Sequence, residues 1–227
     1  MPTVRFYTYE TCVVEQIEPY LIPVQLTSGT IIYQTSDLID TVYFPENAII
    51  SLVNILENGT TTETGIVGRT GMLGLPVILG SDRSYNRAMV QIPNGGTKIS
   101  AQVLKNEFER GEGLYRLLLR YTESRLTEAA QLTVCNRHHT IEERLARWLL
   151  MVQDLIQSDE LPLTQEFIGN MLGVRRSGVT ITAGVLQRAG MISYARGRIN
   201  ILDREALEDT ACECYQLFHQ HYCQTSY

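Results

Sequence analysis

The segment LTQEFIGNMLGVRRSGVTITAGVLQR, residues 163–188, decides how this chain is interpreted. Thr164 is a good N-cap for a helix. Apolar residues follow it at helical spacing: Phe167, Ile168, Met171 and Leu172. Gly173 then supplies a tight turn, and a second helix is expected over 174–188. Two short helices around a glycine turn predict a helix-turn-helix.

The start of the second helix is rich in side chains that can bind DNA. In a helix-turn-helix this end of the second helix enters the major groove. Here it carries Arg175, Arg176, Ser177 and Thr180. Arginine can bind guanine O6 and N7 through two hydrogen bonds, and hydroxyls can contact bases or phosphates. We therefore expect these four residues to contact DNA.

A strand, turn and strand are expected downstream over 191–202, as in a β-wing. Its turn carries Arg196 and Arg198, which are expected to bind phosphates. The segment from Leu163 to Arg204 contains six arginines and only two acidic residues, a local charge of +4 in a chain of net charge −6. Helix-glycine-helix units also occur in ordinary helical domains. The wing and the local positive charge favour DNA binding over that alternative.

The N-terminal part reads as short antiparallel strands. From Pro23 to about Ser100, β-branched runs alternate with turn residues. The clearest hairpin pairs 48–56 with 60–67 around Asn58-Gly59, where the turn requires positive φ. No crossover helices intervene, so a barrel or roll is favoured over a parallel sheet.

A long helix is expected over 114–134 because this stretch has neither proline nor internal glycine. One strip of it repeats at alternating spacings of four and three: Tyr115, Leu119, Thr122, Leu126, Ala129 and Thr133. A second apolar strip consists of Leu114, Leu117, Leu118 and Tyr121. One strip can dock on the roll while the heptad seam meets a partner helix. The alternative is one broad core face in a monomer.

Another helix is expected over 140–157. Thr140 and Glu143 have the spacing of a capping box. The residues expected to be buried are Leu145, Trp148, Leu149 and Val152. The boundary between the two domains is expected near 136–139.

This order of elements resembles the Crp/Fnr family (cyclic-AMP receptor protein and fumarate-nitrate regulator). The resemblance covers nearly the whole chain and implies an α+β fold: an antiparallel β-roll sensor domain like that of cyclic-nucleotide-binding proteins (1–110), a long dimerisation helix (111–137) and a winged helix-turn-helix domain (138–227). It implies a cytoplasmic homodimer on a palindromic double-stranded DNA operator, with RNA polymerase as a further candidate partner.

The resemblance also suggests roles for single residues. Thr164 and Gln165 match phosphate-contacting positions, and Arg176 matches the family's guanine-reading arginine. Ser177 and Ile181 replace the glutamate and arginine of the best-known members, so a different operator sequence is expected.

The sensor cassette departs from the family. Gly71-Met72-Leu73-Gly74 lacks the glutamate that holds the ribose of cyclic AMP, and methionine cannot replace it. The phosphate-binding arginine is shifted by one place, to Arg87 before Ala88, and one place on a strand means the opposite face. Gly71, Met72, Leu73, Arg87 and Ala88 are the candidate ligand pocket. We expect it to hold another small-molecule effector or none, rather than cyclic AMP.

The cysteines are odd in number and crowd the C-terminus, which argues against a disulfide framework. Cys12 is the only cysteine of the N-terminal region, too few thiolates for an iron–sulfur cluster. Cys212-x-Cys214 with His219, His221 and Cys223 could suit zinc, copper or a thiol switch. If 205–221 is one helix, these side chains do not share a face. No metal and no cofactor is therefore predicted.

Two other kinds of function compete with DNA binding. An enzyme built on the roll is disfavoured, because the sequence has no Gly-x-Ser-x-Gly, no phosphate-binding Gly-Lys-Ser/Thr loop and no His-Glu-x-x-His. His138-His139 also fits no known metal motif. The other alternative is a sensor whose winged helix binds a protein instead of DNA. No run of about 18 apolar residues predicts a membrane span.

Overall fold

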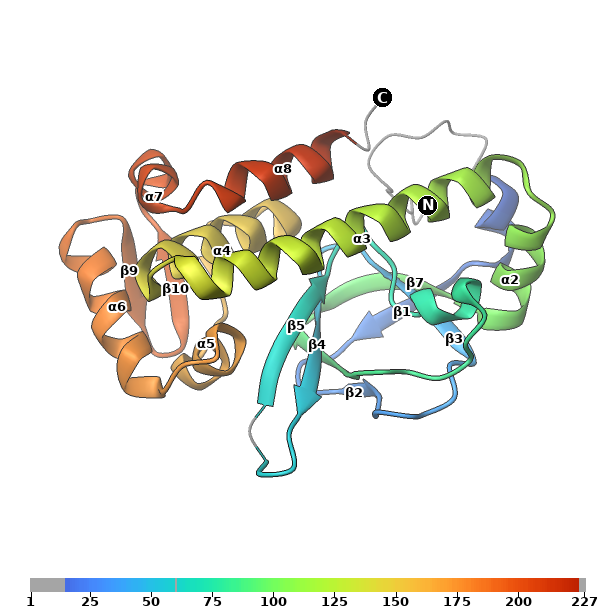
Figure 1. Ribbon diagram of the computed structural model, residues 1–227, viewed down its shortest axis with the longest axis horizontal. Helices are drawn as coiled ribbons and strands as arrows, with labels where there is room; N and C mark the ends of the chain where they lie inside the picture. The colour runs from blue at the N-terminus through green and yellow to red at the C-terminus, as the bar shows by residue number, and fades with distance from the viewer. Residues whose placement is uncertain (1–14, 60, 225–227) are drawn as a thin grey trace. The chain divides into compact units, whose positions relative to one another are not determined.

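The computed structural model describes residues 15–59 and 61–224 (Figure 1). They form two compact units. One contains residues up to Val53 together with Gly65–Thr127, and the other contains Asn54–Thr64 and Glu128–Gln220. Among the described residues, no helix is both long enough and apolar enough to cross a membrane.

The first unit contains two antiparallel sheets. One has the strand order β1-β7-β3 and the other β2-β6-β4-β5. The strands are β1 (Ile22–Leu26), β2 (Ile31–Tyr33), β3 (Thr41–Pro45), β4 (Ile49–Ile55), β5 (Thr61–Val67), β6 (Arg87–Ile92) and β7 (Asn94–Ser100), with 3-10 turns η1 (Glu18–Tyr20) and η2 (Leu75–Leu79). The predicted antiparallel β architecture is confirmed.

The predicted hairpin is also present, as β4 and β5. The two strands are neighbours in the sheet, and Gly59 between them has a φ of +80°. A residue with a Cβ adopts this backbone conformation only at a cost, which explains the glycine. The hydrophobic core between the sheets includes Val42, Ile50 and Val90, all almost fully buried.

Two helices follow, α2 (Ala101–Glu109) and α3 (Glu112–His138). Four residues of α3 complete the core of the β unit: Leu114, Leu117, Leu118 and Tyr121. This confirms the inward strip. The heptad seam lies on the surface, where Tyr115, Leu119 and Leu126 are 42%, 41% and 68% exposed. Of the two strips, only the inward one is therefore part of the core.

The second unit is built on α4 (Ile141–Ile156). Its N-terminus has both reciprocal hydrogen bonds of the predicted capping box between Thr140 and Glu143. Leu145, Trp148, Leu149 and Val152 are buried, as predicted. Helices α6 (Arg176–Arg188) and α7 (Arg204–Thr210) pack against α4. A small antiparallel sheet joins β8 (Glu160–Leu161), β10 (Arg198–Ile201) and β9 (Ile192–Ala195), which gives the predicted wing.

The C-terminal part is not one helix. Helix α7 ends at Thr210, Ala211 is extended (φ −69°, ψ 148°), and α8 (Cys214–Gln224) starts a new helix. The assumption of a continuous helix over 205–221 is therefore wrong. The break changes the directions in which Cys212 and Cys214 point.

Candidate nucleic-acid interface

The turn between α5 (Gln165–Leu172) and α6 fixes the angle of the helix-turn-helix. Thr164 caps α5, because its hydroxyl accepts a hydrogen bond from the Phe167 amide. Gly173 ends α5 with a φ of +67°, in the left-handed region that favours glycine. Gly169 lets the chain return closely, since a Cβ there would lie 3.0 Å from the Val174 carbonyl oxygen. Both glycines are thus needed for the tight turn.

Helix α6 begins two residues later than the sequence suggested. Arg175 has extended backbone angles (φ −68°, ψ 149°) and acts as the N-cap, so the helix starts at Arg176. The apolar side of α6 is buried through Val179, Ala183 and Leu186. The predicted DNA-binding residues lie on the exposed side: Arg175, Arg176, Ser177 and Thr180.

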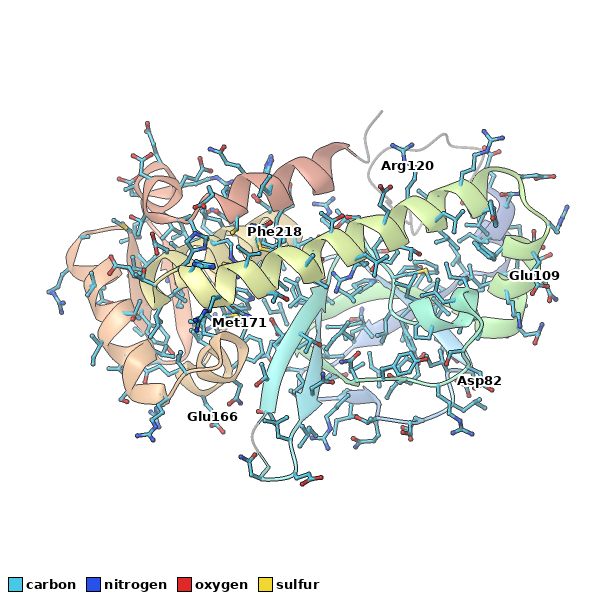
Figure 2. The ribbon with its side chains drawn as sticks, in the orientation of Figure 1. Asp82, Glu109, Arg120, Glu166, Met171 and Phe218 are labelled. Carbon is cyan, nitrogen blue, oxygen red and sulfur yellow. The ribbon has the colours of Figure 1, made fainter. Side chains whose placement is uncertain are left out.

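Gln165 connects the two helices at this surface. Its side-chain oxygen accepts a hydrogen bond from Arg176 Nε at 3.3 Å and another from the Thr180 hydroxyl at 3.1 Å. The structure thus brings three predicted DNA-binding residues together. Figure 2 shows the opposite faces of α5: Glu166 projects outward, whereas Met171 packs inside.

A hollow of about 540 Å³ lies between the start of α5, the start of α6 and the wing. It is lined by Thr164, Gln165, Glu166 and Arg176 together with wing residues 194–197. Arg196 of the wing therefore faces the same hollow as Arg176. The hollow is polar, and Glu166 is the acidic residue of its lining.

The two wing arginines differ in their surroundings. Arg198 forms an ion pair with Glu160, and both side chains remain largely exposed. Arg196 forms no ion pair within the described part of the chain. It occupies the two-residue turn between β9 and β10, where Arg196 and Gly197 have φ values of +52° and +75°. Of the two arginines, Arg196 is therefore the one presented without a carboxylate bound to it.

Backbone groups of the cassette loop, residues 71–74, form hydrogen bonds with other parts of the same unit. Leu73 exchanges two backbone hydrogen bonds with Tyr43, at 2.8 and 3.0 Å. The Tyr121 hydroxyl of α3 accepts from the Met72 amide at 3.2 Å and donates to the Met72 carbonyl at 3.1 Å. A Cβ on Gly71 would lie 2.7 Å from that hydroxyl. The loop is therefore fastened directly to the long helix.

The other predicted pocket residues face in different directions. Met72, Leu73 and Ala88 belong to the hydrophobic core. Arg87 is half-buried on the other face of β6, where its Nε donates to Gln34 at 2.8 Å. This matches the expected change of face between neighbouring residues of a strand. A ligand pocket formed by these residues stays a prediction.

Comparisons with known proteins support this description. Residues 143–210 match the Crp-like helix-turn-helix domain. No curated protein gave a significant match to the sequence. Among solved structures, FixK2 from Bradyrhizobium japonicum is similar, with a TM-score of 0.72 at 16% identity, over 85% of this chain and 98% of that one.

Two further structures have the same fold. A putative transcriptional regulator of the Crp/Fnr family from Eubacterium rectale has a TM-score of 0.68 at 20% identity, covering 89% of this chain and 94% of its own. A CRP-family regulator from Thermus thermophilus has a TM-score of 0.68 at 20% identity, covering 83% and 96%. Residues 143–210 therefore match the Crp-like helix-turn-helix domain, and the chain as a whole has the fold of the Crp/Fnr-type regulators among these solved structures.

Proposed function

We propose that this protein is a DNA-binding transcription regulator, which binds a two-fold symmetric operator as a homodimer and reads it with the start of α6. The observation that carries this proposal is the exposed row Arg175, Arg176, Ser177 and Thr180 at the N-terminal end of that helix. The row borders the hollow that Arg176 and Arg196 both line. A recognition helix and a basic wing on one surface suit a groove and its flanking phosphates.

Arg176 is the proposed guanine reader. Its Nε donates to Gln165, which orients the guanidinium and leaves both terminal nitrogens for a bidentate contact with O6 and N7. Thr164 and Gln165 stand at the N-terminus of α5, where the helix dipole favours a phosphate. Arg196 and Arg198 of the wing would bind phosphates without reading sequence.

The proposed dimer contact is the heptad seam of α3. Leu119 and Leu126 are large apolar residues on the surface of a helix of 27 residues. A partner copy of α3 would cover them by coiled-coil packing. Two copies of α6 would then face two half-sites about one turn of DNA apart.

Signalling is proposed to run from the β unit through Tyr121. The tyrosine binds the backbone of the cassette loop and sits on α3, which continues into the DNA-binding unit. An effector that moved the loop would therefore act on the long helix and shift the population of DNA-binding conformations. Cyclic AMP is disfavoured as this effector, because Met72 replaces the ribose-binding glutamate and is buried in the core.

The test is selection of bound sequences from a random DNA pool with the full-length protein. We expect a palindromic site that the Arg175→Ala/Arg176→Ala variant no longer selects. Arg188→Ala is the matched control, because it removes an exposed arginine from the other end of the same helix.

Salt dependence separates DNA binding from the alternative of a protein-binding wing. Phosphate contacts release counterions, so affinity for the selected site should fall steeply as salt rises. Failure of the wild-type protein to bind DNA in this way would contradict the proposal and favour a protein partner for the wing.

A further inference from the structure

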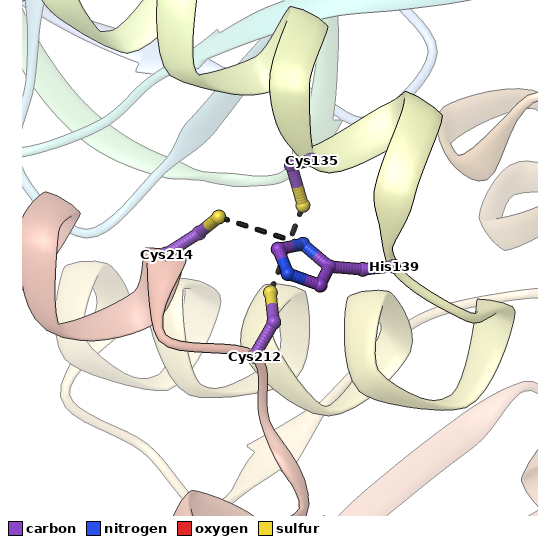
Figure 3. Close-up of side chains that lie close together, drawn as sticks. All are labelled: Cys135, His139, Cys212 and Cys214. Carbon is purple, nitrogen blue, oxygen red and sulfur yellow. Dashed lines mark hydrogen bonds between the residues drawn. The ribbon is translucent and has the colours of Figure 1, made fainter.

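Three cysteines and one histidine from distant parts of the chain point at one another in the second unit (Figure 3). Cys135 lies in the last turn of α3, and His139 follows the end of that helix, four residues later. Cys212 lies in the break between α7 and α8, and Cys214 is the first residue of α8. The three cysteines are buried, and the His139 side chain is 12% exposed.

The sequence had suggested a different group. Cys212 and Cys214 do point into one cluster, because the helix is interrupted between 211 and 213. His219 lies apart from the cluster and packs edge-on against the Tyr215 ring at 5.7 Å. The structure does not describe Cys12, and it does not describe the side chains of His221 and Cys223.

The four ligand atoms have the spacing of a single-metal site. All of them lie within 4.8 Å of one another. The sulfurs of Cys135 and Cys212 are 3.6 Å apart, and Cys214 Sγ is 3.6 Å from His139 Nδ1. A tetrahedral zinc ion with usual bond lengths separates two sulfurs by about 3.8 Å, and a sulfur from a histidine nitrogen by about 3.6 Å. Both observed separations are close to these expected ligand-to-ligand distances.

The residues around the cluster support ligands rather than free thiols. His139 presents Nδ1 to the cluster, while its Nε2 lies 3.1 Å from the Glu213 carboxylate. Metal-binding histidines usually donate their second N–H to such a carboxylate. Gln131 donates from Nε2 to Cys214 Sγ at 3.1 Å, which stabilises negative charge on that sulfur.

The charge balance points the same way. Arg147 and Arg144 are buried, 3% and 9% exposed, and neither forms an ion pair with a carboxylate of the described residues. Arg147 contacts Met151 Sδ at 2.9 Å and the Phe218 ring at 5.2 Å. Zinc with three thiolates and one neutral histidine has one net negative charge, which would offset part of the positive charge of these two buried arginines.

We propose that Cys135, His139, Cys212 and Cys214 bind one Zn²⁺ ion in a closed tetrahedral site. The site links the end of α3 to the chain between α7 and α8, two segments about 75 residues apart in sequence. Binding releases the protons of the three thiols and leaves no open position for a substrate. Its role is to hold the last turn of α3 against the chain between α7 and α8 within the second unit.

Two other chemistries fit less well. A four-iron cluster binds each ligand to a different iron, which separates the ligand atoms more widely than a shared ion does. A disulfide could join Cys135 to Cys212, but it would leave Cys214 and His139 unexplained. The tests below distinguish all three.

The first experiment measures metal in the full-length protein, purified under reducing conditions and freed of loosely bound ions. We expect about one zinc per chain, and little or none in Cys135→Ser and Cys214→Ser. Cys12→Ser and Cys223→Ser are the matched controls, since the proposed ligand set leaves these two cysteines out. Wild-type protein without zinc that also fails to bind added zinc would overturn the proposal, as would iron with acid-labile sulfide.

The second experiment does not depend on how well the variants fold. Co²⁺ added to zinc-depleted wild-type protein should give thiolate-to-cobalt charge-transfer bands and the intense visible bands of a tetrahedral ion, and zinc should displace it. Octahedral cobalt spectra, or a Cys135–Cys212 disulfide found by mass spectrometry of protein prepared anaerobically with reductant, would each refute the site.

Discussion

Replacing Tyr121 by phenylalanine removes a single oxygen atom that holds the cassette loop to the long helix. That oxygen accepts a hydrogen bond from the Met72 amide and donates one to the Met72 carbonyl, at 3.2 and 3.1 Å. Both bonds are buried, and the ring itself would stay in the core. The variant therefore isolates the value of the two hydrogen bonds.

Each such bond contributes about 0.5–1.5 kcal/mol to stability, so the two together should contribute about 1–3 kcal/mol. Local opening of the loop should become more favourable by this amount. Since 1.4 kcal/mol corresponds to a factor of ten, amide exchange at Met72 should accelerate by roughly 5- to 150-fold. The free energy of unfolding of the β unit should fall by a similar amount.

Hydrogen exchange with mass spectrometry of peptides spanning Met72 measures the local effect, and urea unfolding followed by circular dichroism measures the global one. Tyr115→Phe is the matched control, because Tyr115 lies on the same helix and is 42% exposed. Its ring packs on Phe108, and the variant keeps this ring contact. Equal exchange at Met72 in wild type and Tyr121→Phe, or equal acceleration by both variants, would refute the link between loop and helix.

Four further outcomes are expected. Arg176→Ala should cost about 1–3 kcal/mol per half-site and relax base preference there, whereas Arg188→Ala should leave preference intact; competition binding with altered operators measures this. Arg198→Ala should weaken all sequences alike and reduce the salt slope by about 1, so a change in sequence preference would argue against phosphate binding. Leu126→Glu should convert the dimer to a monomer in analytical ultracentrifugation, and an unchanged mass would exclude the seam as the contact. Hydrogen bonds from the Thr140 backbone and hydroxyl lower the pKa of Glu143 below its ordinary value of 4.5. The stability that Glu143 adds over Glu143→Gln should therefore be full at neutral pH and be lost progressively as the pH falls below about 4.5. Acid unfolding curves of the two proteins measure this difference.

Features set by neighbouring residues were predictable from the sequence. The cap at Thr164, the turn at Gly173 and the capping box of Thr140 and Glu143 each depend on residues only a few positions apart. The antiparallel hairpin around Gly59 belongs to the same class. These signals are local and physically specific, so the structure agrees with them.

Features set by distant residues were not predictable in the same way. The helix break at 211–213 falls on Ala-Cys-Glu, which contains neither glycine nor proline. The cysteine cluster joins positions 77 residues apart, and this separation gives no periodic pattern. One signal was available: Cys135 and His139 are four residues apart at the end of an expected helix, a spacing that places two ligands on one face.

At the tip of the wing, the backbone conformation and the positive charge of Arg196 have opposite consequences for stability and for DNA binding. Arg196 adopts a φ of +52°, a conformation that asparagine or glycine reaches more easily than arginine does. A library of wing variants selected for heat resistance should thus be enriched in Arg196→Asn and Arg196→Gly. The same library selected for operator retention at high salt should keep arginine, so the two selections would move this position in opposite directions.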